Sequence, residues 1–427
     1  MPQSIAKAQS RQKILIYGEN YAPEKIGVGR FTGEIGAYLA DRGHAVTVIT
    51  APPHYPGWRV ASPFRAGRYA SEVRDGVKVL RCPIALRSDM RGVWRLIAPL
   101  SFAVSSAPVA LWQLIRFRPD LVLCIEPTLF VAPVGLLGRL LGARVLLHVQ
   151  DLEVDAAFAV GHLKGGFLKR FILGAESFLL RRFDALVTIS KQMRKRLIDK
   201  GVEAGRIAIV RNWVDLTKIK PLAEPNGFRA ELGLTESDFV VLYAGNIGVK
   251  QALEVVLDAA RKLVDRPNIH FVIAGDGPEK ERLQRDYGDL KRLHFLPLQP
   301  EERLCELLNL PDLHVLPQSR GAADLVLPSK LGGMLTSGKP VLATADPGTE
   351  LYDVLQGVSI LAPAGDSAAV AAEIDRLSAE GTHPALGDGR RLAQLFARDA
   401  CLEQFHECLF SNEALPSLVY SSDGIPR

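Results

Sequence analysis

Two lysines in the second half of the chain follow turn-forming residues and have the charge needed to bind a strongly anionic ligand. Lys250 lies in YAGNIGVKQALEVVLDAA (243–260), after a buried-strand pattern that ends at Gly245. Lys330 lies in PSKLGGML, where a helix is expected to begin. Because the first turn of a helix exposes unpaired N–H groups, a lysine there favours a bound phosphate or diphosphate. A solvated surface lysine is the alternative for Lys250.

Glycine-rich turns accompany these lysines. In IAGDGPEKERL (273–283) a strand pattern ends and a helix begins with proline in its first turn. Such a turn either lines a nucleotide site or is simply a well-formed connection. The predicted ligand-binding residues in these turns are Gly245, Asn246, Gly248, Gly275, Gly277 and Ser329.

A further glycine turn lies near the N-terminus, in YAPEKIGVGRFTGEIGAYL. Gly27 and Gly29 precede an expected helix that begins near Arg30, so a ligand can approach the backbone there and an anion is favoured at the helix N-terminus. The spacing is not G-x-G-x-x-G, which disfavours a dinucleotide cofactor. A tight strand-to-helix turn without a ligand is the alternative.

The elements that must position these turns are short, apolar strand patterns separated by helical ones. Most strand patterns are apolar throughout rather than alternating, which is typical of parallel strands covered on both faces. The β-α-β order predicts two doubly wound α/β domains with a linker near 213–228 and a ligand in the cleft between them. The strands are expected at 13–19, 46–50, 77–82, 121–126, 144–149, 185–190, 207–212, 239–245, 270–275, 293–297, 313–317, 340–345 and 358–363.

Domain boundaries follow from this pattern. We expect an N-terminal Rossmann-like domain over 1–215 and a C-terminal one over 216–395. An amphipathic helix is expected at about 389–410, and its part from 396 to 412 is predicted to pack back on the N-terminal domain. A flexible tail is expected over 413–427. The predicted buried stripe of the helix is Leu392, Leu395, Phe396, Leu402, Phe405 and Leu409.

Composition restricts the class of protein. The chain has 427 residues, 48% hydrophobic and 23% charged, with a net charge of +5, which suits two globular domains. Residues 1–215 carry an excess of Lys and Arg, whereas residues 216–427 carry an excess of Asp and Glu. The polar N-terminus lacks a signal-like apolar segment, and five scattered cysteines suggest neither disulfides nor zinc. We therefore expect a cytoplasmic protein without nucleic-acid motifs.

Two segments of the basic half suggest contact with an anionic membrane. LIAPLSFAVSSAPVALW (96–112) is apolar but only 17 residues long, so a buried or interfacial helix is favoured over a spanning one. GHLKGGFLKRFILGAESFLLRRF (161–183) combines basic and apolar residues. The alternative is a helix whose lysines and arginines are merely solvated.

These motifs, taken in order, resemble the GT-B-fold glycosyltransferases of the retaining, sucrose-synthase-like superfamily. Within it, the chain looks most like the bacterial exopolysaccharide group that includes the colanic-acid-type enzymes. The resemblance runs from Lys13 to about Leu409. Its landmarks are ILIYGENYAPEKIGVGRF (14–31), TAPPHYPGW (50–58), VQDLEVDAA (149–157), TISKQMRKRL (188–197), VRNWVD (210–215), YAGNIGVKQ (243–251), IAGDGPE (273–279) and PSKLGGMLTSGKPV (328–341).

The resemblance implies roles for several residues. Lys250 and Lys330 would hold the diphosphate of a nucleotide-sugar donor, and Gly27 would lie near the reacting sugar. The loop from Leu296 to Leu298 would frame the nucleotide base, largely through backbone groups. Asp151 takes the place where relatives carry a His-Asp pair, although Gln150 precedes it here.

A second departure concerns two glutamates that family members carry eight residues apart. They would fall at Leu325 and Gly333, and only the neighbouring Asp324 is acidic. The donor-sugar and ribose contacts are therefore not the usual ones, and activity could be altered or absent.

The sequence thus predicts a hexosyltransferase-type glycosyltransferase (EC 2.4) of exopolysaccharide biosynthesis that acts with retention. No cofactor or metal is expected, since no D-x-D sequence occurs in the chain. The predicted partners are a nucleotide-sugar donor, with GDP-fucose as the suggested one, and a sugar or lipid-linked sugar acceptor at the inner face of the cell membrane. The alternatives are a GT-B-fold sugar-nucleotide epimerase and a non-catalytic nucleotide-sugar-binding component of a polysaccharide assembly complex.

Overall fold

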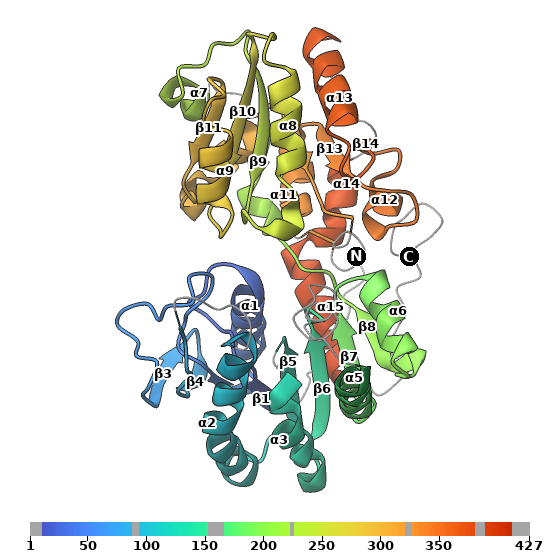
Figure 1. Ribbon diagram of the computed structural model, residues 1–427. Helices are drawn as coiled ribbons and strands as arrows, with labels where there is room; N and C mark the ends of the chain where they lie inside the picture. The colour runs from blue at the N-terminus through green and yellow to red at the C-terminus, as the bar shows by residue number, and fades with distance from the viewer. Residues whose placement is uncertain are drawn as a thin grey trace, which may run out of the picture. The chain divides into compact units, whose positions relative to one another are not determined.

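The computed structural model describes residues 11–87, 94–127, 129–152, 166–222, 226–320, 327–328, 330–380 and 389–411. Contacts divide these residues into two compact units. Unit 1 contains the described residues up to Ile189, Met193–Val210, and those from Gln404 to Ser411. Unit 2 contains Ser190–Gln192 and the described part of Arg211–Glu403. Each unit is a Rossmann-like α/β fold, as the strand pattern predicts (Figure 1).

Unit 1 is built on an eight-stranded sheet with the order β3-β4-β2-β1-β5-β6-β7-β8. Every predicted strand of the first half forms, and β5 is buried at all six positions, as expected for a strand covered on both faces. The strands are β1 (Lys13–Tyr17), β2 (Ala45–Thr50), β3 (Ala70–Arg74), β4 (Val77–Arg81), β5 (Leu121–Glu126), β6 (Arg144–Val149), β7 (Ala185–Thr188) and β8 (Ile207–Ile209).

Strand β3 was not among the expected strands. It pairs antiparallel with β4 through a two-residue turn at Asp75 and Gly76, both of which have positive φ (50° and 74°). Asp-Gly between two short strands is a strong hairpin signal, because this turn needs positive φ at both central residues. The sequence therefore contained the information for β3, although the residues of β3 are mostly polar.

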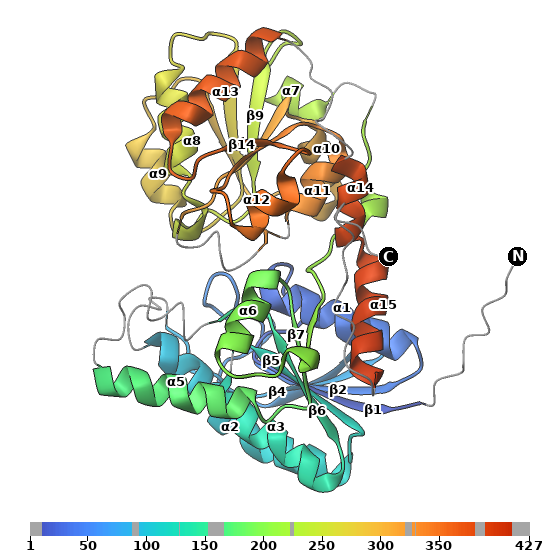
Figure 2. The same cartoon turned by 90° about the vertical axis from the view of Figure 1, so that its right-hand side faces the viewer.

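The helices of unit 1 lie on both faces of its sheet (Figure 2). Helix α1 contacts β2 on one face, and α3 contacts β5 on the other, together with α2. The predicted apolar segment 96–112 lies within α2, and Leu96–Arg116 is the one helix of the described residues long and apolar enough to cross a membrane. The helices are α1 (Gly27–Asp41), α2 (Trp94–Arg116), α3 (Ala132–Leu136), α5 (Gly166–Leu180) and α6 (Lys191–Asp199), with short 3₁₀ turns at η1 (Leu129–Val131), η2 (Leu137–Leu141) and η3 (Ala204–Arg206).

Unit 2 contains a fully parallel six-stranded sheet with the order β11-β10-β9-β12-β13-β14. The chain starts at β9, adds β10 and β11 on one side, and then crosses to β12 on the other side. A crevice at the carboxyl ends of β9 and β12 is therefore the expected ligand position in such a sheet. The strands are β9 (Phe239–Ala244), β10 (Ile269–Ala274), β11 (Leu293–Leu296), β12 (Leu313–Leu316), β13 (Val341–Thr344) and β14 (Ile360–Ala362).

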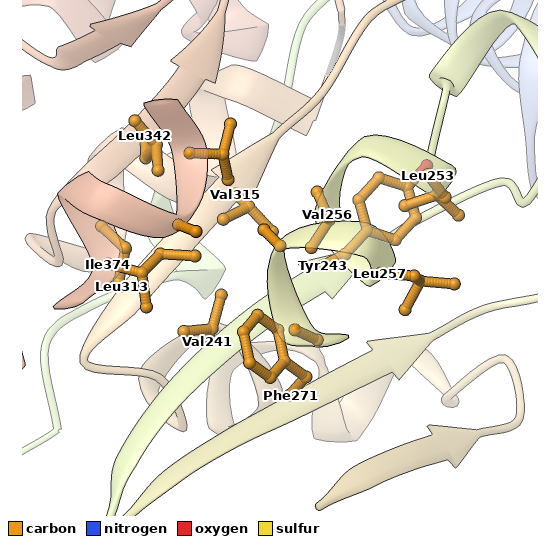
Figure 3. Close-up of a cluster of buried hydrophobic side chains, with 14 of the residues drawn as sticks. Val241, Tyr243, Leu253, Val256, Leu257, Phe271, Leu313, Val315, Leu342 and Ile374 are labelled. Atoms are coloured by element: carbon orange, nitrogen blue, oxygen red, sulfur yellow. The ribbon is translucent and has the colours of Figure 1, made fainter. Parts of the chain in front are cut away.

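Alternate side chains of β9 enter two separate cores. Val241 and Tyr243 pack against α8 and α13 (Figure 3), whereas Val240 and Leu242 pack on the opposite face with residues of α7 and α10. Burial on both faces explains why the strand is apolar throughout. The helices of unit 2 are α7 (Gly227–Glu231), α8 (Glu254–Lys262), α9 (Lys280–Asp286), α10 (Leu304–Asn309), α11 (Lys330–Ser337), α12 (Glu350–Leu355), α13 (Ser367–Glu380) and α14 (Gly389–Ala393), with 3₁₀ turns at η4 (Leu216–Lys218), η5 (Val249–Gln251) and η6 (Glu301–Arg303).

The expected single helix over 389–410 is interrupted. Helix α14 ends at Ala393, a 3₁₀ turn (η7, Gln394–Phe396) follows, and α15 begins at Arg398 and ends at Phe410. The interruption is held by backbone hydrogen bonds with Val214, whose N–H donates to Phe396 and whose carbonyl accepts from Arg398. Of the six predicted stripe residues, Phe396, Leu402, Phe405 and Leu409 are buried, whereas Leu392 and Leu395 are half-buried.

Candidate functional site

In unit 2, backbone hydrogen bonds connect the carboxyl ends of four neighbouring strands and the turns that follow them. The N–H of Gly245, after β9, donates to Ala274 of β10 at 2.9 Å, and the N–H of Gly275 donates to Leu296 of β11 at 3.2 Å. On the other side, the N–H of Ser319, after β12, donates to the carbonyl of Lys250 at 3.1 Å. The predicted glycine turns and Lys250 therefore lie together at the carboxyl ends of the strands.

Main-chain atoms in these turns approach each other too closely for side chains. A Cβ on Gly275 would collide with the carbonyl oxygen of Gly245, and a Cβ on Gly277 with that of Ile247. Both glycines also have φ values near 150°, which residues with a side chain rarely adopt. The backbones of the two turns thus pack directly against each other. We call residues 245–248 and 275–277 the main-chain floor.

Lys330 is the first residue of α11 and lies over this floor. Its Nζ is 3.8 Å from the ring centroid of Tyr243, and an ideal Cβ on Gly245 would be 3.4 Å from the same nitrogen. The Tyr243 hydroxyl donates to the carbonyl of Asn246, which fixes the ring. The structure shows no ion pair between Lys330 and any described residue, and burial lowers the pKa of Lys330 to about 7. An anion beside this amine would stabilise its charged form.

Lys250 occupies a different position from the one expected. It lies in the exposed 3₁₀ turn η5, and α8 begins only at Glu254, so Lys250 is outside the first turn of that helix. Asn246 is exposed and its amide donates to Gln251 at 3.3 Å. A Cβ on Gly248 would be 3.0 Å from these two side chains, so the turn is closely packed around Gly248.

The remaining predicted residues of unit 2 lie partly in the loop after β11 and partly outside the described residues. Leu296 ends β11 and its carbonyl is used by Gly275, whereas Leu298 is exposed in the following loop. Asp324 and Ser329 lie outside the described residues.

Gly333 lies on a face of α11 that points into the apolar core. An ideal Cβ there would be 3.2 Å from Leu308 and 3.3 Å from Ile219. A glutamate at this position would bury its carboxylate among apolar side chains unless the helix moved. The local packing of this chain therefore suits glycine.

In unit 1, the predicted glycines lie at the start of α1. Gly27 is the first helical residue, has a φ of +67°, and an ideal Cβ there would be 3.1 Å from the ring of Tyr55. The preceding Ile26 makes no side-chain cap, so the first-turn N–H groups lack that partner. A Cβ on Gly29 would collide with the carboxylate of Glu24.

A buried histidine and two glutamates hold the loop that carries Tyr55. His54 Nε2 lies 3.2 Å from Glu19 Oε1, and Glu24 Oε1 accepts from the backbone N–H groups of His54 (3.0 Å) and Tyr55 (3.1 Å). Burial acts to lower the pKa of His54, but the hydrogen bond and charge of Glu19 and the charge of Glu24 raise it overall. Burial raises the pKa of Glu24. Sequence analysis did not assign roles to these three residues, which are brought together only by the fold.

Arg81, at the end of β4, also holds the loop that carries His54 and Tyr55. Its guanidinium is buried, pairs with Glu72, and donates to the carbonyls of Ala51 (3.0 Å) and Ala22 (2.6 Å). Those carbonyls belong to the segments that carry His54 and Glu24. Arg81 therefore positions the loop after β2 against the start of α1.

Asp151 follows β6 and its Oδ1 accepts from the N–H of Leu152 at 2.9 Å. Burial raises the pKa of Tyr55, and the charge of Asp151 adds to this effect, so Asp151 lies within electrostatic range of the Tyr55 ring that covers Gly27. The histidine in this strand is His148, which is fully buried against Phe405 and whose pKa is lowered to about 3 by burial. His148 thus belongs to the core.

Within the described ranges, no group of three or more His, Cys, Asp and Glu side chains is arranged to hold a metal ion.

Comparison with protein families assigns both halves of the chain to sugar-transferring enzymes. Residues 27–213 match the glycosyl transferase 4-like domain, and residues 238–380 match glycosyl transferases group 1.

Among curated proteins, the chain is 42% identical over 347 residues to the putative colanic acid biosynthesis glycosyl transferase WcaI of Escherichia coli, covering 79% of this chain and 84% of that protein. It is 26% identical over 306 residues to the probable glycosyltransferase WbjE of Pseudomonas aeruginosa, covering 68% of this chain and 74% of that protein.

Solved structures with the same fold include sucrose-phosphate synthase from Thermosynechococcus elongatus, with a TM-score of 0.70, 18% identity, and coverage of 93% of this chain and 98% of that one. Another is Anabaena HepE in complex with UDP and glucose, with a TM-score of 0.66, 18% identity, and coverage of 94% and 100%. At this identity the likeness concerns the fold.

Proposed function

The chain belongs to the GT-B glycosyltransferases, and from this premise we propose that it moves a sugar from a nucleotide-sugar donor held by unit 2 to an acceptor held by unit 1. Its similarity to a colanic acid biosynthesis enzyme supports a role in exopolysaccharide synthesis. The observation that carries the assignment of the donor site is Lys330, a half-buried lysine whose amine lies over the main-chain floor with no ion pair to any described residue.

The proposed chemistry needs positive charge at the leaving group. Breaking a sugar–phosphate bond leaves negative charge on the diphosphate and positive character on the sugar. Lys330 from α11 and Lys250 from η5 would stabilise the diphosphate, and the turn N–H groups of the main-chain floor would add hydrogen-bond donors. Transfer would proceed with retention at the anomeric carbon, which nuclear magnetic resonance of the product determines directly.

The acceptor would enter at the corner of unit 1 formed by Gly27, Tyr55 and Asp151. An uncapped helix start and an aromatic ring suit the hydroxyls and apolar faces of a sugar. We propose a lipid-linked sugar as acceptor, with the enzyme working in the cytoplasm at the inner face of the membrane. Asp151 is proposed to orient an acceptor hydroxyl.

For the donor we propose GDP-fucose, by analogy with colanic-acid-type enzymes. A panel of nucleotide-sugars tests this by thermal shift, because a ligand that binds only the native state raises the melting temperature. GDP-fucose is expected to give the largest shift, and the same panel offers UDP-glucose as the main competitor. A larger shift with UDP-glucose than with GDP-fucose would refute the donor assignment.

A non-catalytic role remains as a second candidate because the position of one usual glutamate, Gly333, is packed against apolar side chains. The two functions differ in turnover. Incubation of the best-binding donor with a lipid-linked acceptor extract should release the nucleoside diphosphate and yield a longer glycan. Donor binding without release of nucleoside diphosphate under any acceptor condition would support the non-catalytic role.

A further inference from the structure

Helix α2 has its polar side chains turned towards the protein. Ser106 is buried and shares a hydrogen bond with Tyr17 at 2.7 Å, and Ser105 donates to the carbonyl of Pro83 at 2.5 Å. Ser101 accepts from the N–H of Ala85 at 2.9 Å, and Gln113 is buried. The serines and Gln113 of this helix therefore face the rest of unit 1 instead of the solvent.

The opposite face of α2 is apolar and exposed. Leu100, Val104, Leu111 and Ile115 are separated by 4, 7 and 4 residues, which places them on one stripe of the helix. Trp112 is 60% exposed beside this stripe, and Ile115 is 62% exposed. Surface helices of soluble α/β units normally present polar residues on this side.

The exposed apolar surface continues onto η2. Leu114 of α2 would contact a Cβ on Gly138 at 3.4 Å, so the two segments are packed together. Leu140 is 82% exposed, and Leu137 and Leu141 are exposed beside it. We call this area the α2–η2 surface and define it as Leu100, Val104, Leu111, Trp112, Ile115, Leu137, Leu140 and Leu141.

Arginines border the α2–η2 surface. Arg116 and Arg118 are exposed at the end of α2. Arg139 of η2 donates to the carbonyl of Arg182, which brings the exposed Arg181 and Arg182 at the end of α5 to the same edge. An exposed apolar area with a cationic border is complementary to the acyl chains and phosphates of an anionic bilayer.

We propose that the α2–η2 surface inserts into the interface of an anionic lipid bilayer, with α2 lying in the membrane plane. The choice of a bilayer as partner rests on the proposed function, in which the acceptor is lipid-linked. Spanning is disfavoured because the inner side of α2, including Ala98, Phe102 and Leu114, is part of the buried core of unit 1. Leaving that core would expose apolar residues and break the serine hydrogen bonds.

Tryptophan fluorescence provides a direct test, because the chain has only four tryptophans and Trp112 is the one on this surface. The full-length protein is mixed with phosphatidylglycerol-containing vesicles whose acyl chains carry bromine, which quenches nearby indoles. Quenching is expected for the wild type and should be clearly reduced in Trp112→Phe, which keeps the apolar surface and leaves Trp94 at the start of α2 as the remaining indole of this helix. Equal quenching in both proteins would overturn the proposed orientation.

Flotation with vesicles measures how much the α2–η2 surface contributes to the affinity for the membrane. The double variant Trp112→Glu/Ile115→Glu should reduce vesicle binding by at least about tenfold, since charged side chains are excluded from the apolar layer. Val264→Glu, which adds one carboxylate at an exposed valine in unit 2, is the control for added negative charge and should bind as the wild type does. Equal binding of the double variant and the control would overturn the proposal, as would equal binding of the wild type to anionic and neutral vesicles.

Two readouts separate this proposal from the proposed function. Donor thermal shift and nucleoside diphosphate release with a water-soluble acceptor sugar should be unchanged in the double variant. A wild type that transfers sugar but does not bind vesicles refutes docking alone, and one that binds vesicles without any transfer refutes the function alone. A dimer that the double variant converts to a monomer, with no vesicle binding by the wild type, would assign the surface to a second copy instead.

Discussion

At the scale of single residues, the sequence identified the cationic groups but not their surroundings. Lys250 and Lys330 were found because each follows a recognisable turn. The low pKa of Lys330 and its position over Tyr243 depend on residues nearly 90 positions away, which no local pattern reveals. The cluster of His54, Glu19 and Glu24 was missed for the same reason, since these residues meet only after two strands have paired.

Replacement of Lys330 by methionine separates binding from stability. Lys330→Met should lower donor affinity by at least about tenfold, roughly 1.4 kcal/mol, because the diphosphate loses a cation. The same change should raise the melting temperature of the ligand-free protein by a few degrees, because a partly desolvated amine is replaced by an apolar side chain of similar length. Isothermal titration and thermal melts measure both effects, and unchanged donor affinity would contradict the assignment of Lys330.

Donor affinity of the wild type should depend on pH. The amine of Lys330 is charged below its pKa of about 7 and neutral above it, and the proposed contact with the donor requires the charged form. Affinity is therefore greatest below about pH 7 and should fall by up to about tenfold per pH unit above it, until the pKa of the complex is reached. The Lys330→Met variant should show little of this dependence, and a flat profile in the wild type would be inconsistent with the proposed contact.

At the scale of elements, the strands were predictable and the interruptions were not. Continuous apolar runs identified the strands of both parallel sheets, because burial on two faces leaves a strong pattern. The edge strand β3 is largely polar, and only the Asp75-Gly76 turn marked it. The break between α14 and α15 depends on hydrogen bonds from Val214, so the local helical pattern of 389–410 gave no indication of it.

The main-chain floor gives an element-scale prediction. Gly275→Ala should destabilise unit 2 by about 2–4 kcal/mol, because its Cβ would collide with the carbonyl of Gly245 and its φ is unfavourable. Gly348→Ala is the control, since Gly348 also has positive φ (87°) but has open space around it. It should cost only about 1 kcal/mol. Equal losses in denaturant unfolding would show that the collision is relieved elsewhere.

At the scale of the whole molecule, the composition and the order of motifs predicted two α/β units, and each unit has the Rossmann-like sheet expected. The excess of basic residues in the first half was likewise visible in the sequence. The apolar character of the exposed face of α2 was not, because the pattern alone does not tell which side of a mainly apolar helix faces the core.

We propose that unit 2 binds the donor and that unit 1 binds the membrane, so a mutation in one unit should change one of these activities and not the other. Lys250→Ala should lower sugar transfer by at least about tenfold, roughly 1.4 kcal/mol, and leave vesicle flotation unchanged. Near-normal turnover in this variant would contradict the diphosphate assignment of Lys250. Loss of flotation in the same variant would show that the activities of the two units are coupled.

The close approach of Gly275 and Gly277 to the turn after β9 has a consequence for how donor preference can change. The peptide groups there are common to every amino acid, so point mutations cannot retune them without breaking the turn. At the proposed donor site, selection for a new sugar nucleotide must instead act on exposed side chains, such as that of Asn246 within the main-chain floor and that of Leu298 beside it. A library restricted to such rim positions should therefore yield altered donors at little expense in folding.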